Sequence, residues 1–265
     1  MPLTIEALLQ RLVLEGGNRI LLIDESRALW AGDPQAAAHA VETAPTSIAV
    51  VPLTGSLYPR NLADFASRID SAANNADVGH IVVPVDSPGG TYTGTPEAAT
   101  AVARAQAIKP VTAHVGGLAA SAAYWIASQA GAIVMNPSSD AGSIGVLAVH
   151  IEGSQALEQM GVRATILRST PYKAEANMFE PLTAEARDHL QGEIDDAHQE
   201  FVRTVAAGRR VSQAKVSADF GKGRTMGARQ AVAAGMADRV GSLSDVLGAA
   251  RTRMGAMRRR SARVF

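Results

Sequence analysis

Strand-like and helix-like segments alternate from residue 48 to residue 168, and this alternation limits the folds open to the chain more than any other feature. The apolar runs and the helices between them occupy residues 48–53, 61–73, 80–85, 95–108 and 111–115. The run His80–Val85 is apolar at nearly every position, which is typical of a parallel strand that is buried on both faces. The alternation therefore predicts βαβ units and an α/β fold with a mostly parallel sheet.

Weaker patterns within this region and on either side of it complete the expected organisation. Further short helices and strands are predicted at residues 5–14, 20–23, 119–129, 132–135, 144–150, 155–160, 163–167 and 228–234. A long helix is predicted to start at Thr183, which can cap it, and Gly235 can end the last helix. We divide the chain into an N-terminal extension and connector (1–47), a main domain (48–245) and a basic C-terminal tail (246–265).

The lack of cysteine in the sequence excludes disulfides, thiolate metal sites and a cysteine nucleophile. The 25 basic and 25 acidic side chains balance, so the chain as a whole is not built for nucleic acid or an anionic membrane. The last fifteen residues nevertheless hold six arginines and no acid. Because the sequence has neither a signal-peptide pattern nor an apolar run near the ~20 residues that span a bilayer, we expect a soluble protein made in the cytoplasm, without cofactor, metal or membrane.

Two adjacent glycines, Gly89 and Gly90, follow the buried strand in the segment Asp86–Gly90. Glycine permits backbone angles that are closed to other residues and lets a ligand approach the main chain. The carboxyl end of a parallel strand is also where open α/β sheets bind ligands. The backbone N–H of either glycine can thus form half of an oxyanion hole, and a tight turn without function is the alternative. The patterns of nucleotide-binding loops do not occur here.

Ser121 stands among small residues at the start of a predicted helix. Small neighbours let a substrate approach the hydroxyl, which makes Ser121 a candidate nucleophile. The first turn of a helix has free backbone N–H groups, so the N–H of Ala122 together with that of Gly89 can hold a developing oxyanion. The alternative is a serine that only caps its helix.

A serine nucleophile needs a general base within hydrogen-bond reach. Among the six histidines, His150 is the one credible base, because it ends a predicted strand downstream of Ser121. Lys173 is its rival. An ordinary lysine, with a pKa of about 10.4, must be desolvated to become neutral near pH 7. The hydroxyl of Ser143 can orient a neutral lysine without restoring its charge, but spacing alone does not decide between the two bases.

Several short motifs follow one another along the chain. They are Gly-Ser-Leu (55–57), Asp-Ser-Pro-Gly-Gly (86–90), Ala-Ala-Ser-Ala-Ala-Tyr-Trp-Ile-Ala (119–127), Gly-Ser-Ile-Gly-Val (142–146), Tyr-Lys (172–173) and Ala-Gly-Met-Ala-Asp-Arg-Val-Gly (234–241). In this order they resemble the signal peptide peptidase A family of serine peptidases, over residues 48–245. Each motif is weak alone, whereas the ordered set is specific.

The resemblance implies a ClpP/crotonase-like fold and a Ser–Lys dyad that cleaves peptide bonds. The positions that match the family's nucleophile, base, base-orienting hydroxyl and oxyanion donors are Ser121, Lys173, Ser143 and the backbone of Gly89, Gly90 and Ala122. Gly-Ser-Ile-Gly-Val occupies the place where a ClpP-type protease carries its histidine, which argues against His150. One departure concerns Glu175, because a carboxylate facing Lys173 would keep the lysine charged.

Within that family the chain looks more like the branch of tailed-bacteriophage prohead proteases, since it carries no membrane anchor and its segment 173–182 is similar to theirs. This implies scaffold and capsid proteins as substrates, a homo-oligomer, and a place in the host cytoplasm or the prohead. Three alternatives stay open: a structural prohead or minor capsid protein, a bacterial signal-peptide-peptidase-like protease, and an acyl-CoA enzyme on the same fold. The last leaves Ser121 without a role.

Overall fold

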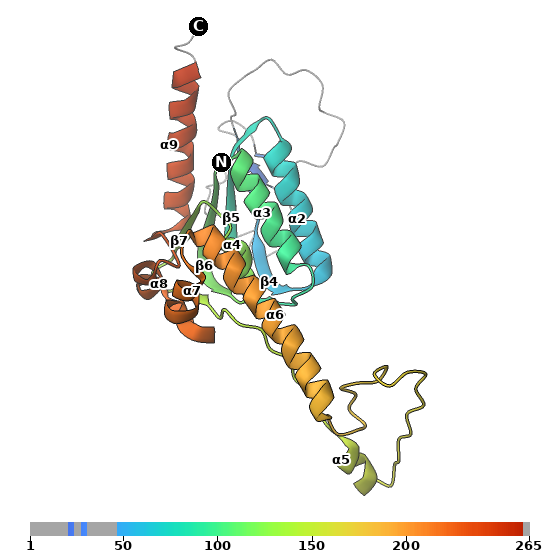
Figure 1. Ribbon diagram of the computed structural model, residues 1–265. Coiled ribbons are helices and arrows are strands. Elements are labelled where there is room, and N and C mark those ends of the chain that lie inside the picture. Colours follow the sequence, from blue (N-terminus) through green and yellow to red (C-terminus); the bar gives the residue numbers. More distant parts are fainter. Residues whose placement is uncertain (1–20, 24–27, 31–46, 262–265) are drawn as a thin grey trace. The chain divides into compact units, whose positions relative to one another are not determined.

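The computed structural model describes residues 21–23, 28–30 and 47–261, and the chain divides into two units (Figure 1). Unit 1 comprises Met1–Ile144 and Val202–Phe265, and unit 2 comprises Gly145–Phe201. The helix expected at residues 5–14 and the connector at 33–46 lie outside the described residues. The sequence did not indicate a separate unit between residues 145 and 201.

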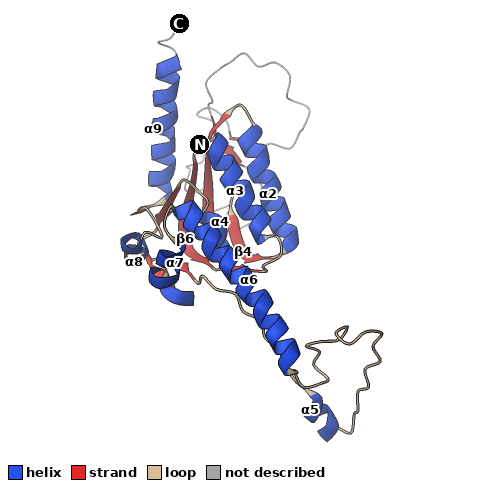
Figure 2. Ribbon diagram, viewed as in Figure 1, coloured by secondary structure: helices blue, strands red, loops and turns tan. Residues whose placement is uncertain are grey.

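Unit 1 is built on a mostly parallel sheet, so the α/β prediction is confirmed (Figure 2). Its strands are β1 (Leu21–Ile23), β2 (Ala28–Trp30), β3 (Ser47–Val50), β4 (Leu53–Leu57), β5 (Val78–Gly90), β6 (Val111–Ala120), β7 (Ala132–Met135), β8 (Asp140–Gly142), β9 (Thr225–Gly227) and β10 (Arg239–Val240). The order across the sheet is β10-β7-β6-β5-β3-β1-β2, with β4 paired to β5 and β8 to both β6 and β9. Only β1 and β2, β1 and β3, and β8 and β9 pair antiparallel among the described strands.

The helices are α2 (Pro59–Asn74), α3 (Thr95–Ile108), α4 (Ala122–Ala127), α5 (Ser154–Gln159), α6 (Ala184–Arg209), α7 (Gln213–Asp219), α8 (Ala228–Ala234) and α9 (Leu243–Ser261). Helices α2 and α3 pack side by side (Figure 1). Leu62, Phe65 and Ile69 of α2 are all buried and lie on one face of the helix, as the spacing of three and four residues requires. The hydroxyl of Thr183 accepts the N–H of Ala186 and caps α6, as expected. No helix among the described residues is both long and apolar enough to cross a membrane.

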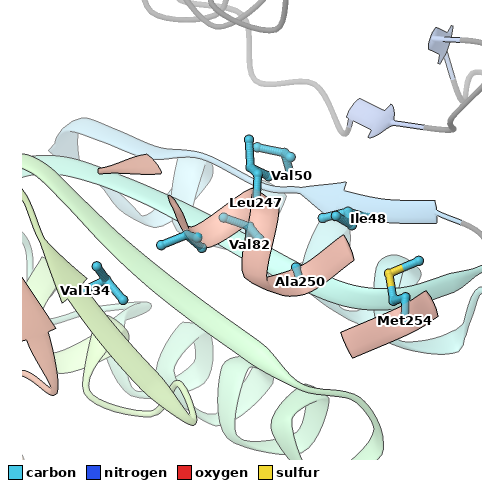
Figure 3. Close-up of a cluster of buried hydrophobic side chains, with 8 residues drawn as sticks. Ile48, Val50, Val82, Val134, Leu247, Ala250 and Met254 are labelled. Carbon is cyan, nitrogen blue, oxygen red and sulfur yellow. The ribbon is translucent and has the colours of Figure 1, made fainter. Parts of the chain in front are cut away.

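Helix α9 includes residues 246–261, which were predicted to belong to a basic C-terminal tail. Figure 3 shows its apolar side chains against the sheet. The buried cluster consists of Ile48, Val50, Val82, Val134, Val246, Leu247, Ala250 and Met254. The arginines of this segment led us to predict a basic tail, but the apolar residues between them recur on one helical face and are buried there.

Two predicted strands are wrong. Residues 144–150 and 163–167 form neither strand nor helix. Their apolar side chains favoured strands, yet residues 145–150 and 163–167 lie in unit 2, where the structure describes no strand that could pair with them. Leu147 and Leu167 are accordingly 81% and 93% exposed.

His80 is buried in β5, opposite Ile48 of β3, and its Nε2 atom lies 2.9 Å from the hydroxyl of Thr112. Burial lowers the pKa of His80 to about 4, and the positive charge of Arg253 acts in the same direction. A histidine in the unfolded chain titrates near 6.5. Between pH 6.5 and 4 the unfolded chain therefore binds a proton here that the folded chain does not. The free energy of unfolding should fall as the pH decreases through this window, by up to about 3 kcal/mol.

Urea unfolding between pH 7 and pH 4.5, at constant ionic strength, measures this loss. His80→Gln removes the titrating group and should flatten the dependence, whereas His189→Gln, on the exposed surface of α6, should leave it unchanged. An equal pH dependence in the wild-type protein and the His80 variant would show that His80 does not cause it.

Candidate active site

Ser121 lies between the end of β6 and the start of α4, in a strained conformation. Its φ is 53° and its ψ −125°, in a region that costs a non-glycine residue about 1–3 kcal/mol. Hydrogen bonds hold it on both sides: its N–H donates to the Gly142 carbonyl (2.8 Å) and its carbonyl accepts the N–H of Trp125 (3.0 Å). Although Ser121 occupies the N-cap position, its side chain makes no capping hydrogen bond. The hydroxyl therefore does not serve the helix, which removes the capping alternative.

Helix α4 is a rigid support for this serine, because all six of its residues are buried. The Tyr124 hydroxyl donates to the carbonyl of Met236 (2.9 Å), which ties the helix to the end of α8. Burial raises the pKa of Tyr124, so its hydroxyl stays protonated and remains a donor. The ring of Trp125 contacts that of Tyr92, with centroids 6.0 Å apart.

Gly89 lies directly against Ser121. A Cβ atom at Gly89 would fall 2.7 Å from the Ala120 carbonyl oxygen, 2.8 Å from the Cβ of Ser121 and 3.0 Å from the backbone nitrogen of Ala122. The φ of Gly89 is 93°, which other residues rarely adopt. The close approach predicted from the two motifs is therefore present in the structure.

The two proposed oxyanion donors differ in their present bonding. The N–H of Ala122 opens a helix and has no partner within it. The N–H of Gly89 donates to the Ser87 hydroxyl (3.1 Å), which in turn donates to the Gly55 carbonyl (2.6 Å). Gly90 lies elsewhere, against the backbone of Leu57 in β4.

Ser87 and Asp86 bind the backbone around Gly89 and Leu118, although the sequence did not assign either of them a role. The buried hydroxyl of Ser87 links β4 to Gly89, as described above. The carboxylate of Asp86 accepts the N–H of Leu118 (3.0 Å), and a Cβ at Gly117 would lie 2.7 Å from that carboxylate. Their place inside the Asp-Ser-Pro-Gly-Gly motif could have indicated that they matter. Their partners Gly55 and Leu118 belong to other strands, so the motif could not predict these bonds.

Ser143 lies beside Ser121 in unit 1. Its neighbour Gly142 accepts the N–H of Ser121, and its own N–H donates to the carbonyl of Arg224 (2.9 Å). Ser143 has a φ of 54°, so it shares with Ser121 a positive φ, which is uncommon for a residue other than glycine. The paired strands β8 and β9 thus fix both serines through neighbouring backbone atoms.

Both candidate bases belong to unit 2, whereas Ser121 belongs to unit 1. Lys173 is exposed in a turn, and the structure describes no ion pair between it and the half-buried Glu175. His150 places its Nε2 atom 3.1 Å from the carbonyl of Asn177. The pairing of Ser121 with Lys173 therefore stays a prediction. Within the described residues, no cluster of three or more His, Asp or Glu side chains could hold a metal ion.

The model of peptidase family S49 matches residues 103–256 of the chain. A Synechocystis sp. protein named as a protease is 35% identical over 62% of the chain and 59% of its own length. Capsid assembly protease C of Escherichia phage lambda is 30% identical over 76% of the chain and 48% of its own length. Head-tail preconnector protein GP5 of Enterobacteria phage P21 is 31% identical over 76% and 42%. The chain thus spans about half the length of these relatives. The resemblance to signal peptide peptidase A and to phage proteases is confirmed.

Proposed function

Because this chain belongs to peptidase family S49, we propose that it is a serine endopeptidase in which Ser121 is the nucleophile and Lys173 the general base. The conformation of Ser121 is the observation that carries the proposal. A strained serine whose hydroxyl caps nothing, packed against a glycine whose backbone N–H is close by, is typical of a nucleophile.

In the proposed mechanism, neutral Lys173 takes the proton of the Ser121 hydroxyl while the oxygen attacks the peptide carbonyl carbon. The N–H groups of Ala122 and Gly89 stabilise the oxyanion, for which Gly89 gives up its bond to Ser87. The lysine ammonium then protonates the leaving amine, and an acyl-enzyme remains on Ser121. A water molecule, deprotonated by Lys173, releases the acid and restores the serine. Ser143 orients the lysine by a hydrogen bond that adds no charge.

This mechanism sets a condition on Lys173. It is exposed in unit 2, and an exposed lysine is solvated as the cation. Desolvation must therefore come from surroundings outside unit 2 in the working enzyme. The lysine must also have no carboxylate beside it that would keep it charged, and among the described residues no ion pair joins Lys173 to Glu175.

We assign the finer fold as ClpP/crotonase-like, with residues 48–245 as the peptidase domain, residues 1–47 as an extension and residues 246–265 as a C-terminal segment. The parallel strands β3, β5, β6 and β7, with helices between them, support this assignment. Helix α9 contributes buried side chains to the sheet, so the C-terminal segment packs on the domain through its first turns.

Unit 2 supports the proposal of a homo-oligomer. Its large apolar side chains are mostly exposed: Leu147, Val149, Ile151, Met160, Val162, Leu167, Tyr172, Met178 and Phe179. An apolar set of this size is typical of a surface that is covered by another chain. We propose that a further copy of this protein provides the cover.

The proposed substrates are scaffold and capsid proteins, cut in the host cytoplasm or in the prohead. The names of the two phage relatives support this choice over a bacterial signal-peptide-peptidase role. Incubating the protein with the scaffold and capsid proteins encoded beside it, followed by mass spectrometry of new termini, tests the proposal. We expect discrete new termini and labelling of Ser121 by a fluorophosphonate or a peptide aldehyde.

The exposure of Lys173 favours one rival, a structural prohead protein in which cleavage is lost. That rival predicts assembly with capsid proteins but neither new termini nor labelling of Ser121. The two outcomes are mutually exclusive, so the same experiment decides between them.

A further inference from the structure

A cavity of about 340 Å³ lies in unit 1, far along the sheet from Ser121. Its walls come from the amino ends of β6 and β7, where Val111, Thr112 and Ala132 lie, and from α9. Ser121, by contrast, follows the carboxyl end of β6. The cavity is therefore separate from the proposed catalytic site, at the opposite ends of the same strands.

Three arginines line the cavity: Arg210, Arg239 and Arg253. None of them forms an ion pair with another described residue, and no carboxylate is among the lining residues that the structure describes. Two acids, Asp238 and Asp245, interact electrostatically with Arg210 and Arg239 but bond elsewhere. Asp238 pairs with Arg209, and Asp245 accepts hydrogen bonds from the N–H and hydroxyl of Ser242. Positive charge in the cavity thus lacks a partner from its own walls.

Gln106 adds a neutral donor with a fixed orientation. Its Oε1 atom accepts the N–H groups of Val111 (2.8 Å) and Gly131 (2.9 Å), which determines which end of the amide is oxygen. The Nε2 group makes no hydrogen bond to a described residue and belongs to a side chain that lines the cavity. An acceptor in the cavity would satisfy it.

We propose that this cavity binds a small molecule through a phosphate group. The lining offers three guanidinium groups and an amide as donors, and no acid. A phosphate monoester carries about two negative charges and three strong acceptor oxygens, which suits several arginines better than a single carboxylate does. The volume is within the lower range of small-molecule sites and exceeds the need of a lone anion. The site goes beyond the proposed peptidase function.

Titration calorimetry on the full chain tests the proposal, with inorganic phosphate, adenosine monophosphate and acetate in chloride buffers of equal ionic strength. We expect saturable binding of both phosphate probes, tighter for the nucleotide if the ligand has an organic part, and none of acetate. Gln106→Glu keeps the acceptor for the two backbone N–H groups but replaces the donor by a negative oxygen. Binding should weaken at least about tenfold, as it should in Arg253→Gln.

Arg229→Gln is the matched control, since Arg229 is an exposed arginine on α8 outside the lining. It should bind like the wild type, and peptide cleavage should be unaffected in all three variants. No saturable binding of phosphate or nucleotide by the wild type overturns the proposal. Equal weakening in Arg229→Gln also overturns it, because this result indicates a diffuse charge effect instead of a small-molecule site.

Discussion

Replacing Ser121 by alanine is expected to lower kcat/KM for peptide cleavage by at least about 10⁴-fold while leaving the free energy of unfolding within about 0.5 kcal/mol of the wild type. The hydroxyl supplies the attacking oxygen in the proposed mechanism, but it caps nothing in α4, so its loss removes no capping bond. Cleavage of a scaffold or capsid substrate, followed by gel and mass spectrometry, measures the first effect. Urea unfolding measures the second.

Substitution of Lys173 should lower peptide cleavage as strongly as substitution of Ser121. Lys173→Arg keeps a long cationic side chain, but a guanidinium does not lose its proton, so this variant separates a base from a mere positive charge. We expect both Lys173→Arg and Lys173→Ala to be inactive, and His150→Gln to be active. Full activity of Lys173→Ala would contradict the proposed Ser121–Lys173 dyad. Loss of activity in His150→Gln alone would identify His150 as the general base.

The strain at Ser121 adds a second test of its role. Glycine adopts a φ of 53° without the side-chain penalty, so Ser121→Gly should be more stable than Ser121→Ala by about 1 kcal/mol. Such a gain would show that the fold holds this serine in place at a cost in stability. Equal stability of the two variants would mean that the backbone at this position stores no strain.

Gly89→Ala is expected to damage both stability and activity. The new Cβ would lie under 3 Å from the Ala120 carbonyl oxygen and from the Cβ of Ser121, at a φ of 93°. Strain and overpacking together should cost about 2–4 kcal/mol, or a fall in Tm of about 5–15 °C. Because displaced backbone moves Ser121 and the N–H of Ala122, we expect kcat/KM to fall at least about 100-fold.

Gly223→Ala isolates the strain from the crowding. Gly223 has a φ of 87°, close to that of Gly89, but a Cβ there meets no atom within 4 Å. The Gly223→Ala variant should lose only the stability that the unfavourable dihedral angle costs, about 1–2 kcal/mol. It should retain full activity. Calorimetric melting and the cleavage assay on both variants provide the comparison. An equally small effect of both would mean that the backbone at Gly89 moves aside freely.

Local patterns predicted the elements that have strong periodicity or clear end signals. Helix α3 and strand β7 occupy the predicted residues, and α8 ends at Gly235 in a left-handed conformation. Strands β5 and β6 continue past their predicted ends through Asp86–Gly90 and Gly116–Ala120. Glycine and proline normally end strands, but here pairing with β4 and β8 extends them, which is a tertiary effect.

In the candidate site, too, local patterns predicted some features, whereas others depend on tertiary contacts. Ser121 and Gly89 were predicted together because each follows a buried parallel strand, and the carboxyl ends of neighbouring strands meet at one edge. The bond from Ser87 to Gly55 could not be predicted, since it joins residues 32 positions apart. Lys173 came from family resemblance, and its pairing with Ser121 awaits the variants described above.

The packing of α9 has a consequence for how the protein folds during synthesis. Ile48 and Val50 emerge from the ribosome early, whereas Leu247 and Met254, which bury them, come near the end of the described chain. One face of the sheet therefore stays uncovered for most of translation, when apolar strands readily associate with other chains. Folding of the nascent chain should pause before this last helix, and a chaperone that binds exposed apolar strands should raise the yield of native protein.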